Sequence, residues 1–273
     1  MRLGLIGFGN IATTLLGLMR QQGLRVEHLS VLTLPGMEDD TRARLDRDFA
    51  GAAEGAEVVT DATGLLAARP DLVVECAGHA AVTAHVPPVL RAGTDVVIVS
   101  IGALADAELL ALVRKAADEG GARLILPAGA VGGIDLLSAL GTAGGLTVRY
   151  RGVKPPRAWE GTPAAQILDL GTLSEAAVFF TGNARQAATD YPRNANVAAT
   201  LALAGAGFEA TRVELVADPA APGNVHEYSV DSPLARYSIR IENQPSAGNA
   251  KTSVTTVWSV LREIRNRIGP VAI

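Results

Sequence analysis

The most constraining feature of the chain is a glycine loop that follows directly on its first apolar run. Leu3–Ile6 is predicted to be a buried strand, and Ile11–Gln22 a helix. The segment between them and into the helix, Gly7-Phe8-Gly9-Asn10-Ile11-Ala12, has the spacing G-x-G-x-x-A. The first glycine permits a tight turn, the second lets the backbone approach a pyrophosphate, and the small third residue lets helix and strand pack closely. Together with the N–H groups and positive dipole end of the helix, this predicts a dinucleotide site formed by Gly7, Gly9, Asn10, Ile11 and Ala12.

The second predicted strand, Val26–Leu34, bears on which dinucleotide would bind. NAD sites usually place Asp or Glu at the end of this strand, where the carboxylate binds the ribose 2′-OH. Here no acid occurs at that point, and Asp39 and Asp40 come slightly late. Arg42 or Arg44 could instead meet the 2′-phosphate of NADP. The sequence therefore leaves NAD and NADP both open as the cofactor.

The first half of the chain alternates short apolar runs with helical stretches, which predicts βαβ units and a parallel sheet. Its further strands are expected at Glu57–Thr60, within 71–78, at Asp95–Ser100 and at Ala122–Leu126, with helices at Arg42–Ala50, Val82–Ala92 and Asp106–Glu119. After about residue 130 the predicted strands alternate between polar and apolar residues, which is typical of a sheet with one uncovered face. They are Thr147–Lys154, Arg212–Val216, Val225–Val230 and Ala235–Glu242, with helices at Thr172–Phe180 and Asn194–Leu203.

We therefore expect an α/β chain of two domains. Residues 1–130 would form a Rossmann-type doubly wound parallel sheet that binds the dinucleotide. Residues 131–250 would form an α+β domain with an open mixed sheet, for substrate binding and dimerisation. The last predicted helix, Lys251–Arg267, is amphipathic, with one stripe formed by Val254, Val257, Trp258, Leu261 and Ile264. The sequence leaves open whether this helix packs back on the first domain.

Composition excludes several classes of protein. The chain carries a net charge of −4 without a basic cluster, so we expect no nucleic-acid partner. Its single cysteine, Cys76, rules out an intramolecular disulfide and a multi-cysteine metal site, and no bound metal is expected. The chain has neither a signal-peptide pattern nor an apolar run of the roughly 18 residues that a membrane span needs. We therefore expect a cytoplasmic protein without a membrane partner.

Four further segments carry a resemblance to a known family. They are Ser100-Ile101-Gly102-Ala103-Leu104, Pro127–Asp135, Gly182-Asn183-Ala184-Arg185 through Asn194-Ala195-Asn196-Val197-Ala198, and Gly223-Asn224-Val225-His226. Together with the glycine loop they resemble the L-aspartate dehydrogenases in order and spacing over nearly the whole chain. One departure is Ala250, where that family usually has proline. The resemblance implies NAD- or NADP-dependent oxidation of L-aspartate to iminoaspartate, reversible with ammonia, which feeds NAD biosynthesis.

The resemblance also implies roles for individual residues. Ala130 and Asn196 would contact the cofactor, and His226 would be the active-site histidine. A histidine titrates near working pH and can serve as a base or hydrogen-bond partner, and His79, after a central strand, is the competing candidate. Asn194 is expected to cap its helix, so that Asn196 would be able to reach a ligand. The side chains that could hold the substrate carboxylates are Lys154, Lys251, Arg193 and Arg151.

Other interpretations stay open on the sequence alone. A related two-domain oxidoreductase, such as a dihydrodipicolinate reductase or a homoserine dehydrogenase, would share the first domain. A dinucleotide-sensing protein without catalysis would need the glycine loop but not His226. A sheet with one uncovered face must bury it somewhere, and a symmetric homodimer is the simplest solution. The sequence does not fix the preferred cofactor, the physiological direction or the residues that bind the substrate carboxylates.

Overall fold

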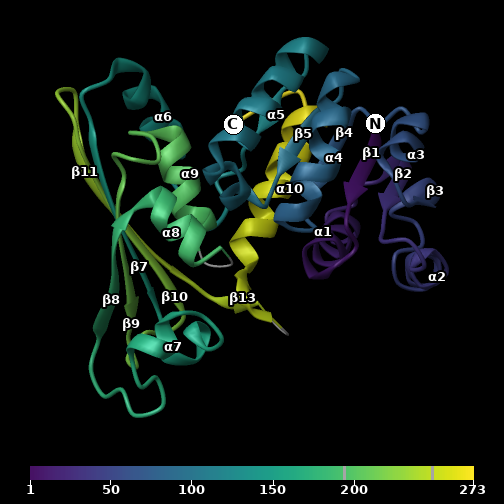
Figure 1. Cartoon of the computed structure of the whole chain (residues 1–273). Coiled ribbons are helices and arrows are strands. Elements are labelled where there is room, and N and C mark those ends of the chain that lie inside the picture. Colours follow the sequence, from purple (N-terminus) through teal and green to yellow (C-terminus); the bar gives the residue numbers. More distant parts are fainter. Residues whose placement is uncertain (193–194, 247–248) are drawn as a thin grey trace. The chain divides into compact units, whose positions relative to one another are not determined.

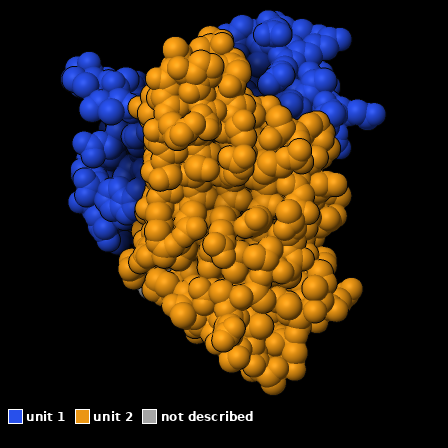
Figure 2. Space-filling model, turned by 90° about the vertical axis from the view of Figure 1, so that its left-hand side faces the viewer, with its two compact units in different colours: residues 1–127, 257–273 blue, residues 128–256 orange. Residues whose placement is uncertain are grey.

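The computed structural model describes residues 1–192, 195–246 and 249–273. The chain forms two compact units, coloured separately in Figure 2. Unit 1 comprises Met1–Pro127 together with Val257–Ile273, and unit 2 comprises Ala128–Thr256. In the described part of the chain, no helix is long and apolar enough to cross a membrane.

Unit 1 contains a six-stranded sheet in which all neighbouring strands are parallel, in the order β3-β2-β1-β4-β5-β6. Its strands are β1 (Arg2–Ile6), β2 (Val26–Leu32), β3 (Ala53–Val59), β4 (Leu72–Glu75), β5 (Asp95–Ile98) and β6 (Leu124–Ile125). The helices between them are α1 (Asn10–Gln21), α2 (Glu38–Asp48), α3 (Ala62–Ala67), α4 (His79–Arg91) and α5 (Ala107–Gly120), and a 3₁₀ helix, η1, covers Ile101–Ala105. The strand order reverses between β1 and β4, as in a doubly wound dinucleotide-binding fold. The expected fold class of this half is confirmed.

The last helix, α10 (Val254–Ile268), completes the core of unit 1. Its buried residues are Val257, Val260, Leu261 and Ile264. Two predictions for this helix were wrong. Trp258 is 41% exposed and does not belong to the buried stripe, which includes Val260 instead. The helix also starts later than Lys251, because Asn249–Ser253 forms strand β13, which pairs with β12 (Pro245–Ser246).

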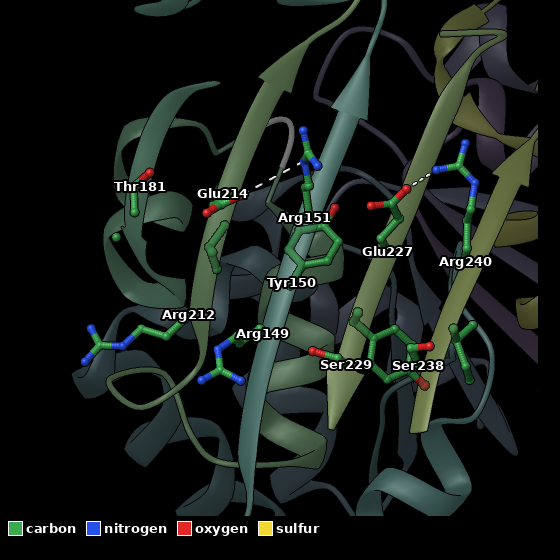
Figure 3. Close-up of a pocket in the computed structure, with 14 residues that line it drawn as sticks. Arg149, Tyr150, Arg151, Thr181, Arg212, Glu214, Glu227, Ser229, Ser238 and Arg240 are labelled. Atoms are coloured by element: carbon green, nitrogen blue, oxygen red, sulfur yellow. Dashed lines mark hydrogen bonds and ion pairs between the residues drawn. The ribbon is translucent and has the colours of Figure 1, made fainter. Parts of the chain in front are cut away.

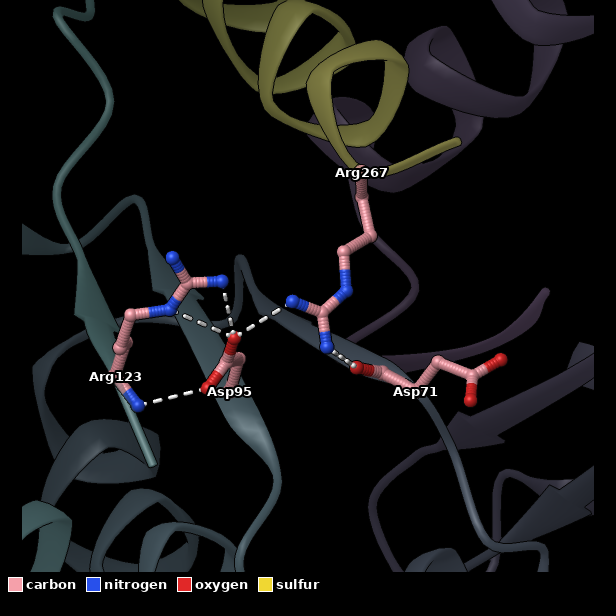
Figure 4. Close-up of polar contacts among 4 residues, drawn as sticks. All are labelled: Asp71, Asp95, Arg123 and Arg267. Atoms are coloured by element: carbon pink, nitrogen blue, oxygen red, sulfur yellow. Dashed lines mark hydrogen bonds and ion pairs between the residues drawn. The ribbon is translucent and has the colours of Figure 1, made fainter. Parts of the chain in front are cut away.

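An ion-pair cluster fixes the end of α10 to the start of β5 (Figure 4). Asp95, the first residue of β5, accepts hydrogen bonds from the backbone N–H and guanidinium of Arg123 at 2.7 to 3.1 Å. The guanidinium of Arg267 lies 3.1 Å from the same carboxylate and also donates to the carbonyl of Asp71. Because Asp95 is only 8% exposed, these partners satisfy a carboxylate that has lost most of its water.

Unit 2 is built on a five-stranded mixed sheet in the order β11-β10-β7-β9-β8. Its strands are β7 (Thr147–Lys154), β8 (Ala177–Asn183), β9 (Arg212–Ala217), β10 (Asn224–Asp231) and β11 (Arg236–Asn243). Only β7 and β9 are parallel; the other neighbours are antiparallel. The helices α6 (Ile134–Ala143), α8 (Ala184–Asp190) and α9 (Asn196–Ala204) lie on one face of this sheet (Figure 1), and the shorter α7 covers Ala164–Ile167. The expected open mixed sheet is confirmed.

The helix predicted over Thr172–Phe180 was wrong. The second half of that segment belongs to β8, which pairs antiparallel with β9. Pairing with a neighbouring strand outweighs the local helical pattern, because intrinsic preferences are small compared with tertiary contacts.

Candidate active site

The glycine loop of unit 1 has the backbone geometry that a bound pyrophosphate requires. Gly7 has a φ of +96°, and a Cβ placed on it would lie 2.6 Å from the Cβ of Ala77. No side chain fits there, so glycine at position 7 allows the loop to turn tightly against the connection that follows β4. Gly9 precedes α1 without a side-chain cap, and a Cβ on it would meet nothing within 4 Å. The N-terminus of α1 therefore has space before it for an anionic ligand.

The five residues predicted for this site lie together at the start of α1. Gly9 and Asn10 are exposed, Ile11 is half-buried and Ala12 is completely buried. Burial of Ala12 allows α1 to pack closely on the sheet, as expected for the third position of the motif. The described residues thus fit a dinucleotide phosphate at this loop.

The two arginines left open for a 2′-phosphate lie in different places. The Arg44 guanidinium carbon lies 5.0 Å from the centre of the Phe8 ring, in the glycine loop. Arg44 also approaches Asp40 at 3.9 Å. Arg42 instead donates to the carbonyl of Ala56 on β3, at 3.4 Å. Of these two arginines, Arg44 is therefore the one in contact with a residue of the glycine loop.

Two further titratable residues of unit 1, Cys76 and His79, follow β4. The Cys76 sulfur lies 3.5 Å from the carbonyl oxygen of Ile6 and 3.7 Å from that of Gly7. Burial, with the nearby Glu75 charge, raises the pKa of the Cys76 thiol far above its ordinary value, so it is a poor nucleophile. His79 is the first residue of α4, and partial burial lowers its pKa. His79 belongs to unit 1 and His226 to unit 2.

His226 lies on β10 in the covered face of the unit 2 sheet. It is 4% exposed, and its Nδ1 lies 2.8 Å from the hydroxyl oxygen of Tyr150 on β7. The two rings are roughly parallel, with centres 6.0 Å apart. Burial, together with the positive charge of Lys154, lowers the pKa of His226 to about 3. The imidazole is therefore neutral at working pH, and no hydrogen-bond partner of its Nε2 is seen among the described residues.

The position of the Tyr150 hydroxyl depends on a glycine in its own strand. Gly152 lies opposite His226 in the β7–β10 ladder. A Cβ on Gly152 would lie 2.7 Å from the Tyr150 hydroxyl oxygen. The absence of a side chain at residue 152 thus leaves room for the hydroxyl to reach the imidazole.

Of the two candidates for carboxylate binding whose side chains are described, Lys154 lies on the same face of the sheet as His226. It ends β7, is 5% exposed, and its ammonium lies 5.2 Å from the centre of the Trp159 ring. Burial lowers the pKa of Lys154 to about 8. Arg151 lies on the opposite face of the sheet, 4.0 Å from Glu214. Arg193 and the side chain of Lys251 lie outside the described residues.

The loop that carries Ala130 is fixed to the end of the same sheet. Its carbonyl accepts a hydrogen bond of 2.9 Å from the side-chain amide of Asn243, the last residue of β11. The Asn243 amide oxygen in turn accepts from Ser253 and Thr255, at 2.9 and 2.7 Å. Asn243 pairs with Asn224, two residues before His226 on β10. The structure therefore brings the Ala130 loop and His226 to the same end of β10 and β11.

Asn196 occupies the first turn of α9. The residue before that helix is Ala195, which provides no side-chain cap, and the expected cap Asn194 lies outside the described residues. The backbone carbonyl of Asn196 accepts from the Thr200 hydroxyl at 2.9 Å.

Tyr150 and Asn243 are site residues that the sequence pattern did not predict. Period-two alternation along β7 could have placed Tyr150 on the face of Lys154, but its contact with His226 depends on the strand register.

Together, His226 and Lys154 combine a neutral buried imidazole with a neighbouring buried ammonium. Such a pair can accept a proton and bind an anionic substrate.

Family models match both halves of the chain. Residues 135–267 match the model described as "Aspartate dehydrogenase, C-terminal". Residues 7–127 match "Homoserine dehydrogenase, NAD binding domain". The second match accounts for the dinucleotide-binding fold that the two families share, and the first concerns the half that carries His226.

Individual relatives extend this similarity over the full length. The chain is 44% identical to the L-aspartate dehydrogenase of Ruegeria pomeroyi over 97% of this chain and 92% of that one. It is 42% identical to that of Polaromonas sp. over 98% and 97% of the two chains. The crystal structure of aspartate dehydrogenase from Thermotoga maritima superposes with a TM-score of 0.73 at 28% identity, covering 100% and 99%. The chain belongs to the L-aspartate dehydrogenase family.

Proposed function

We propose that the chain oxidises L-aspartate to iminoaspartate with NAD or NADP, and that His226 is its catalytic residue. The observation that carries the assignment of His226 is its buried hydrogen bond with Tyr150 beside Lys154, on the scaffold of this family. The bound nicotinamide supplies the acceptor for the hydride that leaves Cα. Side chains of the protein would accept the proton from the substrate and bind its carboxylates.

His226 suits the proton transfer that must accompany hydride loss. The α-ammonium of aspartate must lose a proton before its lone pair can assist departure of the hydride. His226 Nε2 can accept this proton only in the tautomer that carries hydrogen on Nδ1, and that N–H then donates to the Tyr150 oxygen. Two bound carboxylates would raise the pKa of His226 from its low value and strengthen it as a base. Lys154 is the cation proposed to hold one of these carboxylates.

The proposed cofactor contacts are the glycine-loop residues together with two residues of unit 2. Gly7, Gly9, Asn10, Ile11 and Ala12 would bind the pyrophosphate. The resemblance supports Ala130 and Asn196 as further contacts. It also supports a role of the product in NAD biosynthesis, and a cytoplasmic location would suit an enzyme that draws on the intracellular NAD and NADP pools.

The activity is tested by following NADH and NADPH formation with L-aspartate, with other amino acids and with homoserine. We expect turnover with L-aspartate and a loss of about a hundredfold or more in kcat for His226→Gln. The matched control is His85→Gln, on α4 of unit 1, which should keep the wild-type rate. Dinucleotide binding without turnover of any amino acid would favour the sensing protein, and preference for homoserine would favour the related oxidoreductase.

We further propose that the open face of the unit 2 sheet forms a homodimer interface. The face surrounds a hollow of about 760 Å³ (Figure 3). Its side chains carry both signs of charge, with Arg151 next to Glu214 and Arg240 paired with Glu227. A patch that contains both signs can complement a second copy of itself across a twofold axis. Light scattering should give the mass of a dimer.

A further inference from the structure

A buried carboxylate in unit 1 connects the loops that follow β4 and β5. Glu75, the last residue of β4, is completely buried. Its Oε1 accepts from the backbone N–H groups of Ala77 and Gly78, at 2.8 and 2.9 Å, and from the Ser100 hydroxyl at 2.9 Å. Its Oε2 accepts from the backbone N–H of Ser100 at 3.0 Å. One side chain thus fixes the connection after β4 to the connection after β5.

These four donors are suited to an ionised carboxylate. Oε1 accepts three of these hydrogen bonds and Oε2 accepts one, and such bonds are stronger to a charged acceptor than to a neutral one. Burial raises the pKa of Glu75, while the bonds from Gly78, Ser100 and Ala77 act in the opposite direction. A carboxylate is costly at a completely buried position, so its presence there calls for a role that apolar packing would not provide.

The fixed loops lie at the carboxyl ends of strands where a dinucleotide crosses the sheet. The sheet order reverses between β1 and β4, and ligands bind outside the carboxyl ends at such a point. The β1–β3 half carries the glycine loop, so the β4–β6 half receives the other mononucleotide. The connection after β4 also touches the glycine loop, since Ala77 packs against Gly7 and the Cys76 N–H donates to Ile6.

We propose that Glu75 is a positioning residue for the dinucleotide, which holds the two loops that receive its nicotinamide half. The inference rests on the proposed function in that the ligand is NAD or NADP. It goes beyond that function because Glu75 would act through the loop backbone, without itself contacting the cofactor.

The test compares two buried carboxylates of the same sheet. Glu75→Gln replaces one acceptor oxygen by an amide that faces a backbone N–H, so the loops must shift. Asp95→Asn alters the carboxylate at the opposite end of β5, which holds Arg123 and Arg267 (Figure 4). Binding of NADH and of 5′-AMP is measured by calorimetry at 25 °C, on proteins first checked by circular dichroism to be folded at that temperature. The probe 5′-AMP reports on the β1–β3 half alone.

We expect Glu75→Gln to raise the Kd for NADH about tenfold, the size expected for one lost buried hydrogen bond, and to leave that for 5′-AMP unchanged. Asp95→Asn should lower the midpoint of thermal unfolding and leave both Kd values unchanged. The KM for the dinucleotide should rise in Glu75→Gln without a matching rise in the KM for L-aspartate.

Wild-type NADH affinity in Glu75→Gln would overturn the proposal, as would an equal loss of affinity in Asp95→Asn. If Glu75→Gln does not fold, Ser100→Ala removes only the hydroxyl donor, and an unchanged Kd for NADH in that variant also overturns it. A wild-type protein that binds NADH but does not oxidise L-aspartate would refute the proposed activity, while the comparison of Kd values would still decide the role of Glu75.

Discussion

At the scale of single residues, the hydrogen bond between Tyr150 and His226 makes a separate prediction about catalysis. Tyr150→Phe removes the only described partner of Nδ1, so the imidazole loses the contact that selects its tautomer. We expect kcat with L-aspartate to fall about tenfold to a hundredfold, with the dinucleotide Kd unchanged. Nitrogen-15 NMR of the histidines should show a change in the tautomer of His226. Unchanged kcat together with an unchanged His226 spectrum would contradict this role.

Lys154 makes a prediction that depends on pH. Its pKa of about 8 means that the ammonium form predominates below pH 8 and is lost as pH rises above it. If Lys154 binds a substrate carboxylate, the affinity for succinate, which lacks the amine, should fall above pH 8. His226, with a pKa of about 3, does not titrate in this range.

Two variants separate this explanation from other causes of pH dependence. Lys154→Arg keeps its charge to far higher pH and should remove the decline between pH 8 and 10. Lys154→Met should bind succinate at least about tenfold more weakly throughout, because a charged hydrogen bond is lost. An alkaline decline that persists unchanged in Lys154→Arg would exclude Lys154 as its source.

Arg44 predicts how the chain distinguishes NADP from NAD. Its guanidinium lies over Phe8 of the glycine loop, while Arg42 is directed to β3. Arg44→Gln should weaken NADPH and 2′,5′-ADP by about tenfold and leave NADH nearly unaffected, since only the first two carry the extra phosphate. Arg42→Gln is the matched control. Equal losses for NADH and NADPH in Arg44→Gln would show that it does not recognise the 2′-phosphate.

The predictable part of the site was the part encoded by neighbouring residues. The G-x-G-x-x-A spacing located Gly7, Gly9 and Ala12 because their roles follow from one short turn. The contacts of Glu75 with Ser100, and of Tyr150 with His226, join residues far apart in sequence. Such contacts depend on strand order and register, which local patterns do not determine.

At the scale of elements, two helix glycines predict opposite effects of the same substitution. Gly17 lies inside α1, and a Cβ there would meet nothing within 4 Å outside the helix backbone. Gly17→Ala should stabilise the protein by about 0.5–1 kcal/mol, because alanine is the better helix former. Gly120 ends α5, and its Cβ would lie 1.9 Å from the backbone oxygen of Leu90 in α4. Gly120→Ala should destabilise the protein by about 1–3 kcal/mol or more, because its methyl group would overlap that oxygen.

The measurement is the midpoint of thermal or urea unfolding for both variants. Opposite shifts would show that α4 and α5 pack backbone to backbone at Gly120. A higher midpoint for Gly120→Ala would refute that close approach.

Elements were predictable where a pattern persisted over many residues, as in α1 and β7. The segment from Thr172 to Phe180 failed because it is short, and its second half becomes β8 only by pairing with β9. The buried stripe of α10 was shifted for a similar reason, since the surface against which it packs comes from the first strands of the chain.

At the scale of the whole molecule, the open face of the unit 2 sheet makes the last prediction. A twofold interface places each charge of the face near charges of the second copy, so the balance of signs matters. The double variant Arg149→Glu and Arg212→Glu replaces two positive charges of this face by negative ones. Glu214 and Glu227 would then lie near acidic side chains of the second copy. Like charges at an interface cost several kcal/mol, so the dimer Kd should rise by about a hundredfold or more.

The control is the double variant Arg114→Glu and Lys115→Glu, at exposed positions on α5 of unit 1. It changes the net charge by the same amount as the variant of the open face. Sedimentation over a concentration series should show the face variant dissociating into monomers, while the α5 variant stays dimeric. Activity measured in the same samples would then show whether the isolated subunit can turn over L-aspartate. A wild-type monomer, or equal dimer stability in the two variants, would mean that the charged face has another purpose, because an interface must respond to its own charges more than to distant ones.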